Sequence, residues 1–137
     1  MPARPVLVVE DSDEDFQTVL DAARRAALPH PIVRASSGGE CLRLLRAGPR
    51  GRALLVLLDL NTHGDDGREA LRQIRSDDNL RALPLVVLSA SANPRDLQFC
   101  YAQGANAYHV KPVDHAQHLQ MLGSIFAYWL GSAVLPA

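Results

Sequence analysis

Apolar runs of strand length alternate five times with segments of helical periodicity along the chain. An unbroken apolar run of about four to eight residues is typical of a strand buried on both faces, whereas apolar positions spaced about three and four residues apart are typical of an amphipathic helix. Strands are expected at about Pro5 to Glu10, Ile32 to Ala35, Ala53 to Leu60, Leu85 to Ser89 and Ala107 to Val110. Helices are expected from an N-cap at Asp13 to near Pro29, around Leu42 and Leu45, and at about Arg68 to Arg75, Pro94 to Gln103 and Asp114 to Leu130.

This alternation predicts an α/β fold, a doubly wound five-stranded parallel sheet with helices on both faces. Five successive βα units suit the flavodoxin-like order 2-1-3-4-5, which places the first and third strands side by side at the point where ligands of such sheets bind. We expect residues 1–137 to form a single domain, in which a C-terminal helix begins at about residue 114 and leads into a short apolar tail.

Polar side chains stand where four of the predicted strands end. These residues are Glu10 and Asp11, Asp59, Ser89, and Lys111. Because the carboxyl ends of parallel strands meet at one rim of a sheet, we expect them to share one pocket. Three carboxylates placed close together must take up protons or bind a cation. An all-oxygen site without Cys or His suits Mg²⁺, or Mn²⁺, better than Zn²⁺, and a bound cation would keep Asp59 ionised and nucleophilic.

Composition narrows the possible partners and the compartment. With 14 Lys and Arg against 15 Asp and Glu, the formal charge of -1 provides no field that would attract nucleic acid or an anionic membrane surface. No apolar run approaches the roughly 18 residues of a membrane span, and the chain starts without a secretory signal, so we expect a cytoplasmic protein. Cys41 and Cys100 lie in helical patterns without metal-ligand spacing and are expected to be reduced packing residues.

The ordered motifs resemble the receiver domain of the response-regulator family, and the resemblance covers nearly all of the chain. It implies a two-component phosphorelay in which a sensor histidine kinase supplies a phosphoryl group. The family's phosphoacceptor corresponds to Asp59, and the lysine and hydroxyl that assist it correspond to Lys111 and Ser89. The resemblance therefore predicts a phosphoacceptor rather than an enzyme, with slow self-dephosphorylation.

The resemblance also assigns the metal ligands and the switch. It implies that Asp11 and Asp59 hold Mg²⁺ directly, that Glu10 reaches it mainly through water, and that the backbone carbonyl of Asn61 is a further ligand. Ser89 takes the place of the hydroxyl that reports phosphorylation, and Tyr108 that of the aromatic residue that follows it, so that the fourth helix, fifth strand and fifth helix present a changed surface. The family also implies a cis bond between Lys111 and Pro112.

Three segments support a narrower resemblance. They are Asp59-Leu60-Asn61, Asp66-Gly67-Arg68-Glu69 and Phe126-Ala127-Tyr128-Trp129-Leu130. They are similar to the corresponding segments of single-domain regulators that serve bacterial phytochrome histidine kinases. A phytochrome kinase is therefore the expected partner.

The last predicted helix is more apolar than one core face requires. Its stripe consists of Leu119, Leu122, Ile125, Phe126 and Trp129. Met121, Tyr128 and Leu130 fall partly outside it, and an apolar tail follows. This pattern predicts a homodimer through the face of the fourth and fifth helices, with Met121, Tyr128, Trp129 and Leu130 at the interface. The alternative is a tail that folds back over its own domain.

Other interpretations stay open from the residues alone. His115 and His118 lie three residues apart and could share a metal, but a solvated helix face is the simpler expectation. The domain could be a phosphorylation-independent binding module, against which the complete set of acids, hydroxyl and lysine argues. A Mg²⁺-dependent phosphatase with an aspartyl-phosphate intermediate is disfavoured, because its general acid would stand where the chain has Asn61.

Overall fold

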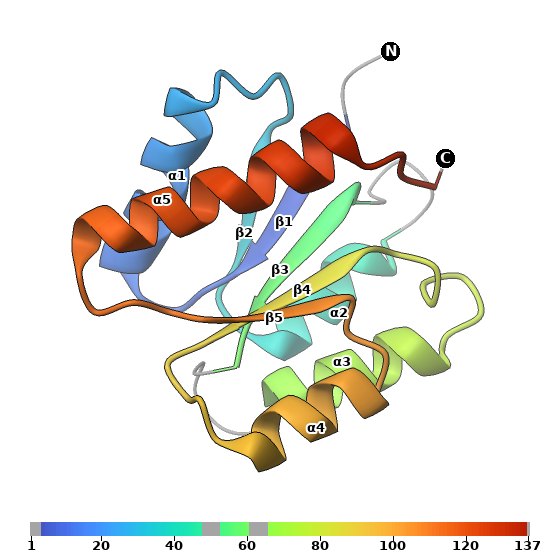
Figure 1. Ribbon diagram of the computed structural model, residues 1–137. Helices are drawn as coiled ribbons and strands as arrows, with labels where there is room; N and C mark the ends of the chain where they lie inside the picture. Colours follow the sequence, from blue (N-terminus) through green and yellow to red (C-terminus); the bar gives the residue numbers. More distant parts are fainter. Residues whose placement is uncertain (1–3, 48–52, 61–65, 137) are drawn as a thin grey trace.

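A computed structural model of the chain describes residues 4–47, 53–60 and 66–136. Its five strands are β1 (Val6–Val9), β2 (Ile32–Ala35), β3 (Leu55–Asp59), β4 (Leu85–Ser89) and β5 (Ala107–Val110). Its helices are α1 (Asp13–Arg25), α2 (Gly38–Leu45), α3 (Asp66–Ser76), α4 (Pro94–Ala102) and α5 (His115–Phe126), followed by a π-helical turn, η2 (Ala127–Ser132). The strands are all parallel and lie in the order β2-β1-β3-β4-β5, which confirms the predicted fold class (Figure 1).

Two helical layers cover the sheet. Figure 1 shows α1 and α5 on one face and α2, α3 and α4 on the other. Alternate strand residues enter the two layers: Val8 and Leu57 pack with α1 and α5, whereas Val9 and Leu58 pack with α2 and α3. The period of two and the complete burial of β1, β3 and β4 explain the unbroken apolar runs of the sequence. Cys41 and Cys100 are buried and form no disulfide with each other, as expected.

Side-chain caps define where the helices begin. The first helix is capped by Ser12, whose hydroxyl accepts a hydrogen bond from the Asp15 backbone N–H at 3.2 Å. The prediction of Asp13 as the N-cap was wrong by one residue, because Asp13 lies in the first turn and its carboxylate binds Arg34 at 2.8 Å. Asp114 caps α5 as the sequence predicts, accepting a hydrogen bond from the Gln117 N–H at 2.9 Å.

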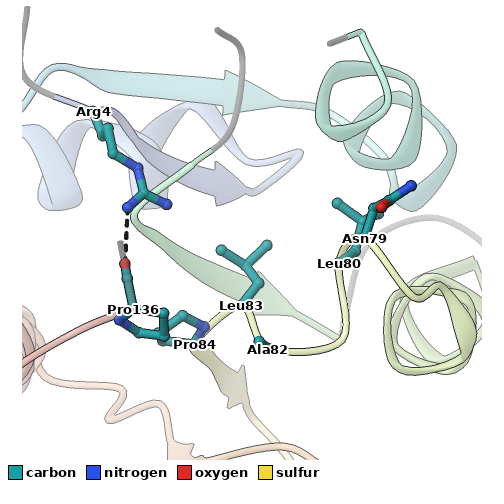
Figure 2. A pocket seen from close by; sticks show the side chains of 7 residues that line it. All are labelled: Arg4, Asn79, Leu80, Ala82, Leu83, Pro84 and Pro136. Carbon is teal, nitrogen blue, oxygen red and sulfur yellow. Dashed lines mark hydrogen bonds between the residues drawn. The ribbon is translucent and has the colours of Figure 1, made fainter. Parts of the chain in front are cut away.

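After α5 the chain runs to the end of the sheet at which the strands begin. This end lies opposite the rim that carries the polar residues. Arg4 joins three segments there. It donates one hydrogen bond to the Pro136 carbonyl at 2.9 Å (Figure 2) and another to the Ala53 carbonyl at 2.8 Å. A small cavity of about 80 Å³ beside them is lined in part by Leu83 and Pro84. The end of the tail thus folds back over its own domain.

Within the described ranges, no helix has the length and apolar character that crossing a bilayer requires.

Candidate functional site

The ends of four strands bring the predicted polar residues together. Asp59 ends β3 beside Leu88, Glu10 follows β1 next to it, and Ser89 ends β4. Lys111 follows β5, and its backbone N–H donates to the Ser89 carbonyl at 2.7 Å. Glu10, Asp59 and Ser89 are all buried although they are polar. The parallel register therefore places the acids, the hydroxyl and the lysine at one rim of the sheet.

Lys111 forms ion pairs with three carboxylates at this site. Its Nζ lies 2.6 Å from Asp59 Oδ2, 2.6 Å from Asp15 Oδ2 and 3.4 Å from Glu10 Oε1. Burial alone would lower the pKa of Lys111, but the hydrogen bonds to Asp15 and Asp59 and the charges of Asp59 and Glu10 outweigh it and hold the pKa above its usual range. Lys111 is also the only lysine in the sequence, so no other lysine side chain can balance these carboxylates.

The pKa of Glu10 is strongly raised in the folded protein. Burial raises its pKa from 4.5 to about 8, helped by a hydrogen bond to Asp59 and by the charge of that carboxylate. The attraction of Lys111 and the hydrogen bond from the Ser12 N–H, at 3.2 Å, act in the opposite direction and are weaker. Glu10 is therefore largely protonated at neutral pH before any cation enters the site.

Asp15 is a member of the cluster that the sequence analysis missed. Oxygen atoms of Glu10, Asp15 and Asp59 lie within 4.8 Å of one another. Asp15 reaches them from the acidic first turn of α1, one helical turn after Asp11, and that spacing was the signal available in the sequence. Asp11 is half-buried and lies outside this group, so its role as a ligand stays a prediction. Asn61 lies outside the described residues.

The donor set fits a small divalent cation. Three carboxylates offer hard oxygen donors within one ion's reach, and no Cys or His belongs to the group. Mg²⁺ and Mn²⁺ prefer such ligands, with water filling the other positions. A dication would also allow Glu10 to release its proton, because it supplies the positive charge that burial otherwise denies to the ionised carboxyl.

Ser89 and Tyr108 are both hydrogen-bonded to Ser91, in the loop between β4 and α4. Ser89 Oγ accepts a hydrogen bond from the Ser91 N–H at 3.1 Å, and the Tyr108 hydroxyl donates to the Ser91 carbonyl at 2.7 Å. Tyr108 is half-buried and packs against the core on the α2–α4 side of the sheet. The aromatic side chain is therefore turned inward in this structure.

Two expectations near Lys111 were wrong. Among the described residues no peptide bond is cis, so the bond before Pro112 is trans. The two forms of such a bond differ in free energy by only about 0.5 to 1 kcal/mol, which a sequence pattern does not resolve.

His118 is buried rather than solvated, because it lies four residues before Leu122 on the inward stripe of α5. It lines a hollow of about 230 Å³ beside Asp15 and Lys111, and burial lowers its pKa.

The four residues predicted for a dimer interface differ in exposure. Tyr128 is 57 % exposed, and its ring meets that of Trp129 edge-on at a centroid distance of 5.1 Å. Met121, Trp129 and Leu130 are half-buried and pack against the core between the sheet and α1 and α5. The largest part of the accessible apolar surface in this set therefore belongs to Tyr128.

Comparisons with known proteins agree with this geometry. The response regulator receiver domain matches residues 6–123. Response regulator Rcp1 of Synechocystis sp. is 31 % identical over an alignment 142 positions long, which covers 99 % of this chain and 95 % of Rcp1. The crystal structure of the phosphorylated cyanobacterial phytochrome response regulator RcpA superposes with a TM-score of 0.91 at 35 % identity, covering 98 % of this chain and 99 % of RcpA. The Mn²⁺-bound form of Rcp1 also gives a TM-score of 0.91, at 31 % identity, with the same coverage.

Proposed function

The chain belongs to the response regulator receiver domain family, and from this premise we propose that it is a single-domain response regulator that accepts a phosphoryl group on Asp59 from a sensor histidine kinase. The contact that best supports the proposal is the 2.6 Å pairing of Lys111 Nζ with Asp59 Oδ2 inside the buried carboxylate cluster. A structural aspartate at a strand end would not need an ammonium held by two further acids.

The donor of the phosphoryl group is proposed to be a phytochrome-type histidine kinase. The support is the similarity over nearly the whole chain to RcpA, which is described as a phytochrome response regulator. We expect transfer to occur in the cytoplasm.

The transfer requires mainly positioning and charge neutralisation. A carboxylate oxygen of Asp59 forms the new bond to phosphorus while the bond to the kinase histidine nitrogen breaks and that nitrogen keeps the electron pair. The transition state is loose, with charge spread over three equatorial oxygens. Lys111 provides a compact positive charge for one of them, and the Ser89 hydroxyl can donate to another. A bound Mg²⁺ or Mn²⁺ supplies the remaining positive charge.

The output is proposed to pass through Tyr108 and the surface formed by α4, β5 and α5. In this structure the Tyr108 hydroxyl donates a hydrogen bond to the Ser91 carbonyl at 2.7 Å, which ties the ring to the loop that follows Ser89. We propose that phosphorylation raises the population of this inward arrangement of Tyr108.

Self-association through the same surface is part of the proposal. Tyr101 of α4, Val110 of β5 and Tyr128 beyond α5 are large apolar or aromatic side chains that are each 44 % or more exposed. A Tyr128→Ala variant is expected to sediment more slowly than the wild type at the same concentration. An unchanged sedimentation profile would remove this interface from consideration.

The decisive experiment is the intact mass after incubation with acetyl phosphate, with and without Mg²⁺. We expect one phosphoryl adduct that requires Mg²⁺, is absent in Asp59→Asn, and persists in the control Asp78→Asn, which changes a carboxylate that is 91 % exposed in its side chain. A folded wild-type protein that acquires no adduct from this donor, or from a phosphorylated kinase, would instead indicate a phosphorylation-independent binding module.

A further inference from the structure

Ser91 holds the loop between β4 and α4 through all of its polar groups. Its N–H donates to Ser89 Oγ at 3.1 Å, and its carbonyl accepts from the Tyr108 hydroxyl at 2.7 Å. Its own hydroxyl donates to Asp96 Oδ2 at 2.7 Å and accepts from the Asn93 N–H at 3.1 Å. One residue thus contacts Ser89, Tyr108 and the first turn of α4 at the same time.

The network continues from α4 to α3. Asp96 Oδ1 accepts a charge-assisted hydrogen bond from Arg68 Nη2 at 2.6 Å, and both side chains are only partly exposed. The hydrogen bonds from Ser91 and Arg68 hold the pKa of Asp96 below its usual range, so this carboxylate remains ionised throughout the neutral range. The charge-assisted pair of Arg68 and Asp96 therefore keeps its charged acceptor at neutral pH.

Arg68 is anchored next to the phosphoacceptor strand. The neighbouring Gly67 lies against the end of β3, where an added Cβ would be in ordinary van der Waals contact, 3.5 Å from the Asp59 carbonyl oxygen and 3.5 Å from the Leu60 Cα. The first turn of α3 therefore lies next to the end of the strand that carries Asp59. Arg68 of this turn and Ser91 are both hydrogen-bonded to Asp96, which connects the turn to the β4–α4 loop.

Apolar burial does little to hold the loop itself. Ala90, Ala92 and Asn93 are exposed, and Ser91 is the half-buried residue among them. The conformation of the segment therefore depends on the polar contacts of Ser91 rather than on packing.

We propose that Arg68, Asp96 and Ser91 are positioning residues that hold the β4–α4 loop in the arrangement that places Ser89 for the phosphoryl group and keeps Tyr108 inward. This inference rests on the proposed function of Asp59 as phosphoacceptor. None of the three residues belongs to the carboxylate cluster. They set the fraction of molecules in which the site is already arranged, and hence its apparent affinity for a phosphoryl group.

The test measures binding of beryllofluoride, an analogue of the phosphoryl group, in the presence of Mg²⁺ by titration calorimetry. Ser91→Ala and Asp96→Asn are each expected to weaken beryllofluoride binding by about threefold to tenfold, the effect of losing one or two modest hydrogen bonds. Affinity for Mg²⁺ alone is expected to remain that of the wild type, because neither residue belongs to the carboxylate cluster. Ser91→Thr keeps the hydroxyl and is expected to restore binding.

Arg95→Gln is the matched control. Arg95 precedes Asp96 in α4 and is exposed, and its side chain makes no hydrogen bond or ion pair with any residue that the structure describes. Removing its charge tests whether a change in the electrostatic field near Asp96, rather than loss of the hydrogen-bond network, weakens beryllofluoride binding. We expect Arg95→Gln to bind beryllofluoride as the wild type does.

A second readout follows Tyr108 directly. The chain has three tyrosines, so incorporation of fluorotyrosine gives three ¹⁹F signals, and Tyr108→Phe identifies the relevant one. In Ser91→Ala and Asp96→Asn the Tyr108 signal is expected to shift toward that of an exposed ring, and beryllofluoride is expected to reverse the shift. A residue that merely stabilised the fold would leave this signal in place.

The outcomes separate the two proposals. Wild-type protein that fails to bind beryllofluoride would refute the phosphoacceptor function, and this inference with it. Wild-type binding together with folded Ser91→Ala and Asp96→Asn variants that match it in affinity and in the Tyr108 signal would refute the positioning network alone.

Discussion

The proton on Glu10 provides a quantitative test of the metal site. With a pKa of about 8, this carboxyl is about nine-tenths protonated at pH 7 in the protein without a cation. A divalent cation that binds Glu10, Asp15 and Asp59 favours the ionised form, so its binding must release close to one proton at pH 6.5 to 7 and about half a proton at pH 8. The apparent affinity for Mg²⁺ should accordingly rise by nearly tenfold per pH unit below pH 7 and flatten above pH 8.

The same shift has a defined effect on stability. The folded-state pKa of Glu10 lies above its unfolded value of 4.5, so the folded state binds the proton more tightly. The associated stabilisation is complete below about pH 4.5 and is lost as the pH rises through 8. It amounts to at most about 5 kcal/mol, and Mg²⁺ should restore much of the loss at pH 8.

Titration calorimetry in buffers of different ionisation enthalpy measures the released proton directly. Glu10→Gln mimics the protonated carboxyl and should abolish the release and flatten the pH dependence, although the cation binds more weakly. Glu14→Gln, which changes an exposed carboxyl in the first turn of α1, should leave the release unchanged. Proton release below about one-fifth of a proton at pH 6.5 in the wild type would refute the protonated state of Glu10 and the argument built on its burial.

Three further predictions concern the fold and the surroundings of the site. Arg75→Ala removes hydrogen bonds to the carbonyls of Gly104, Arg81 and Leu83 and to Asn106, and should lower the free energy of unfolding in urea by about 2 to 4 kcal/mol. His118→Leu should raise the melting temperature relative to wild type increasingly as the pH falls below 6.5, since burial lowers the pKa of His118 and the folded state resists its protonation; a constant difference between pH 5 and 8 would contradict this. Asp15→Asn should accelerate modification of Lys111, the only lysine, by an amine reagent, as measured by peptide mass, and equal rates would show that Asp15 does not shield it.

The fold was predictable because its sheet is buried. Strands such as Leu55–Asp59 and Leu85–Ser89 are covered on both faces, so they appear in the sequence as apolar runs that no amphipathic helix would produce. The polar residue at the end of each run then stands out, since a parallel sheet has one rim at which all these ends converge. Asp59, Ser89 and Lys111 were found in this way.

The parts that the sequence analysis missed depend on how helices pack on that rim. Asp15 belongs to a helix whose first turn carries three acids, and only the position of α1 relative to β1 selects which of them enters the site. His118 was expected in solvent from its residue type, although its spacing from Leu122 placed it on the inward face. The end of α5 was overestimated, because an apolar stripe does not distinguish an α-helix from the π-helical turn that follows Phe126.

Two separate sets of contacts connect the site to the helices on the two faces of the sheet. Lys111 binds Asp59 and Asp15 at 2.6 Å each, so neutralising or adding charge at Asp59 changes what holds the first turn of α1, and α1 packs against α5. Ser89 instead leads through Ser91 to α4 and α3. A phosphoryl group that engages both Lys111 and Ser89 would therefore act on both helical layers at once. Variants at Asp15 should then disturb the α1–α5 side and leave Tyr108 in place, whereas variants at Ser91 should do the reverse.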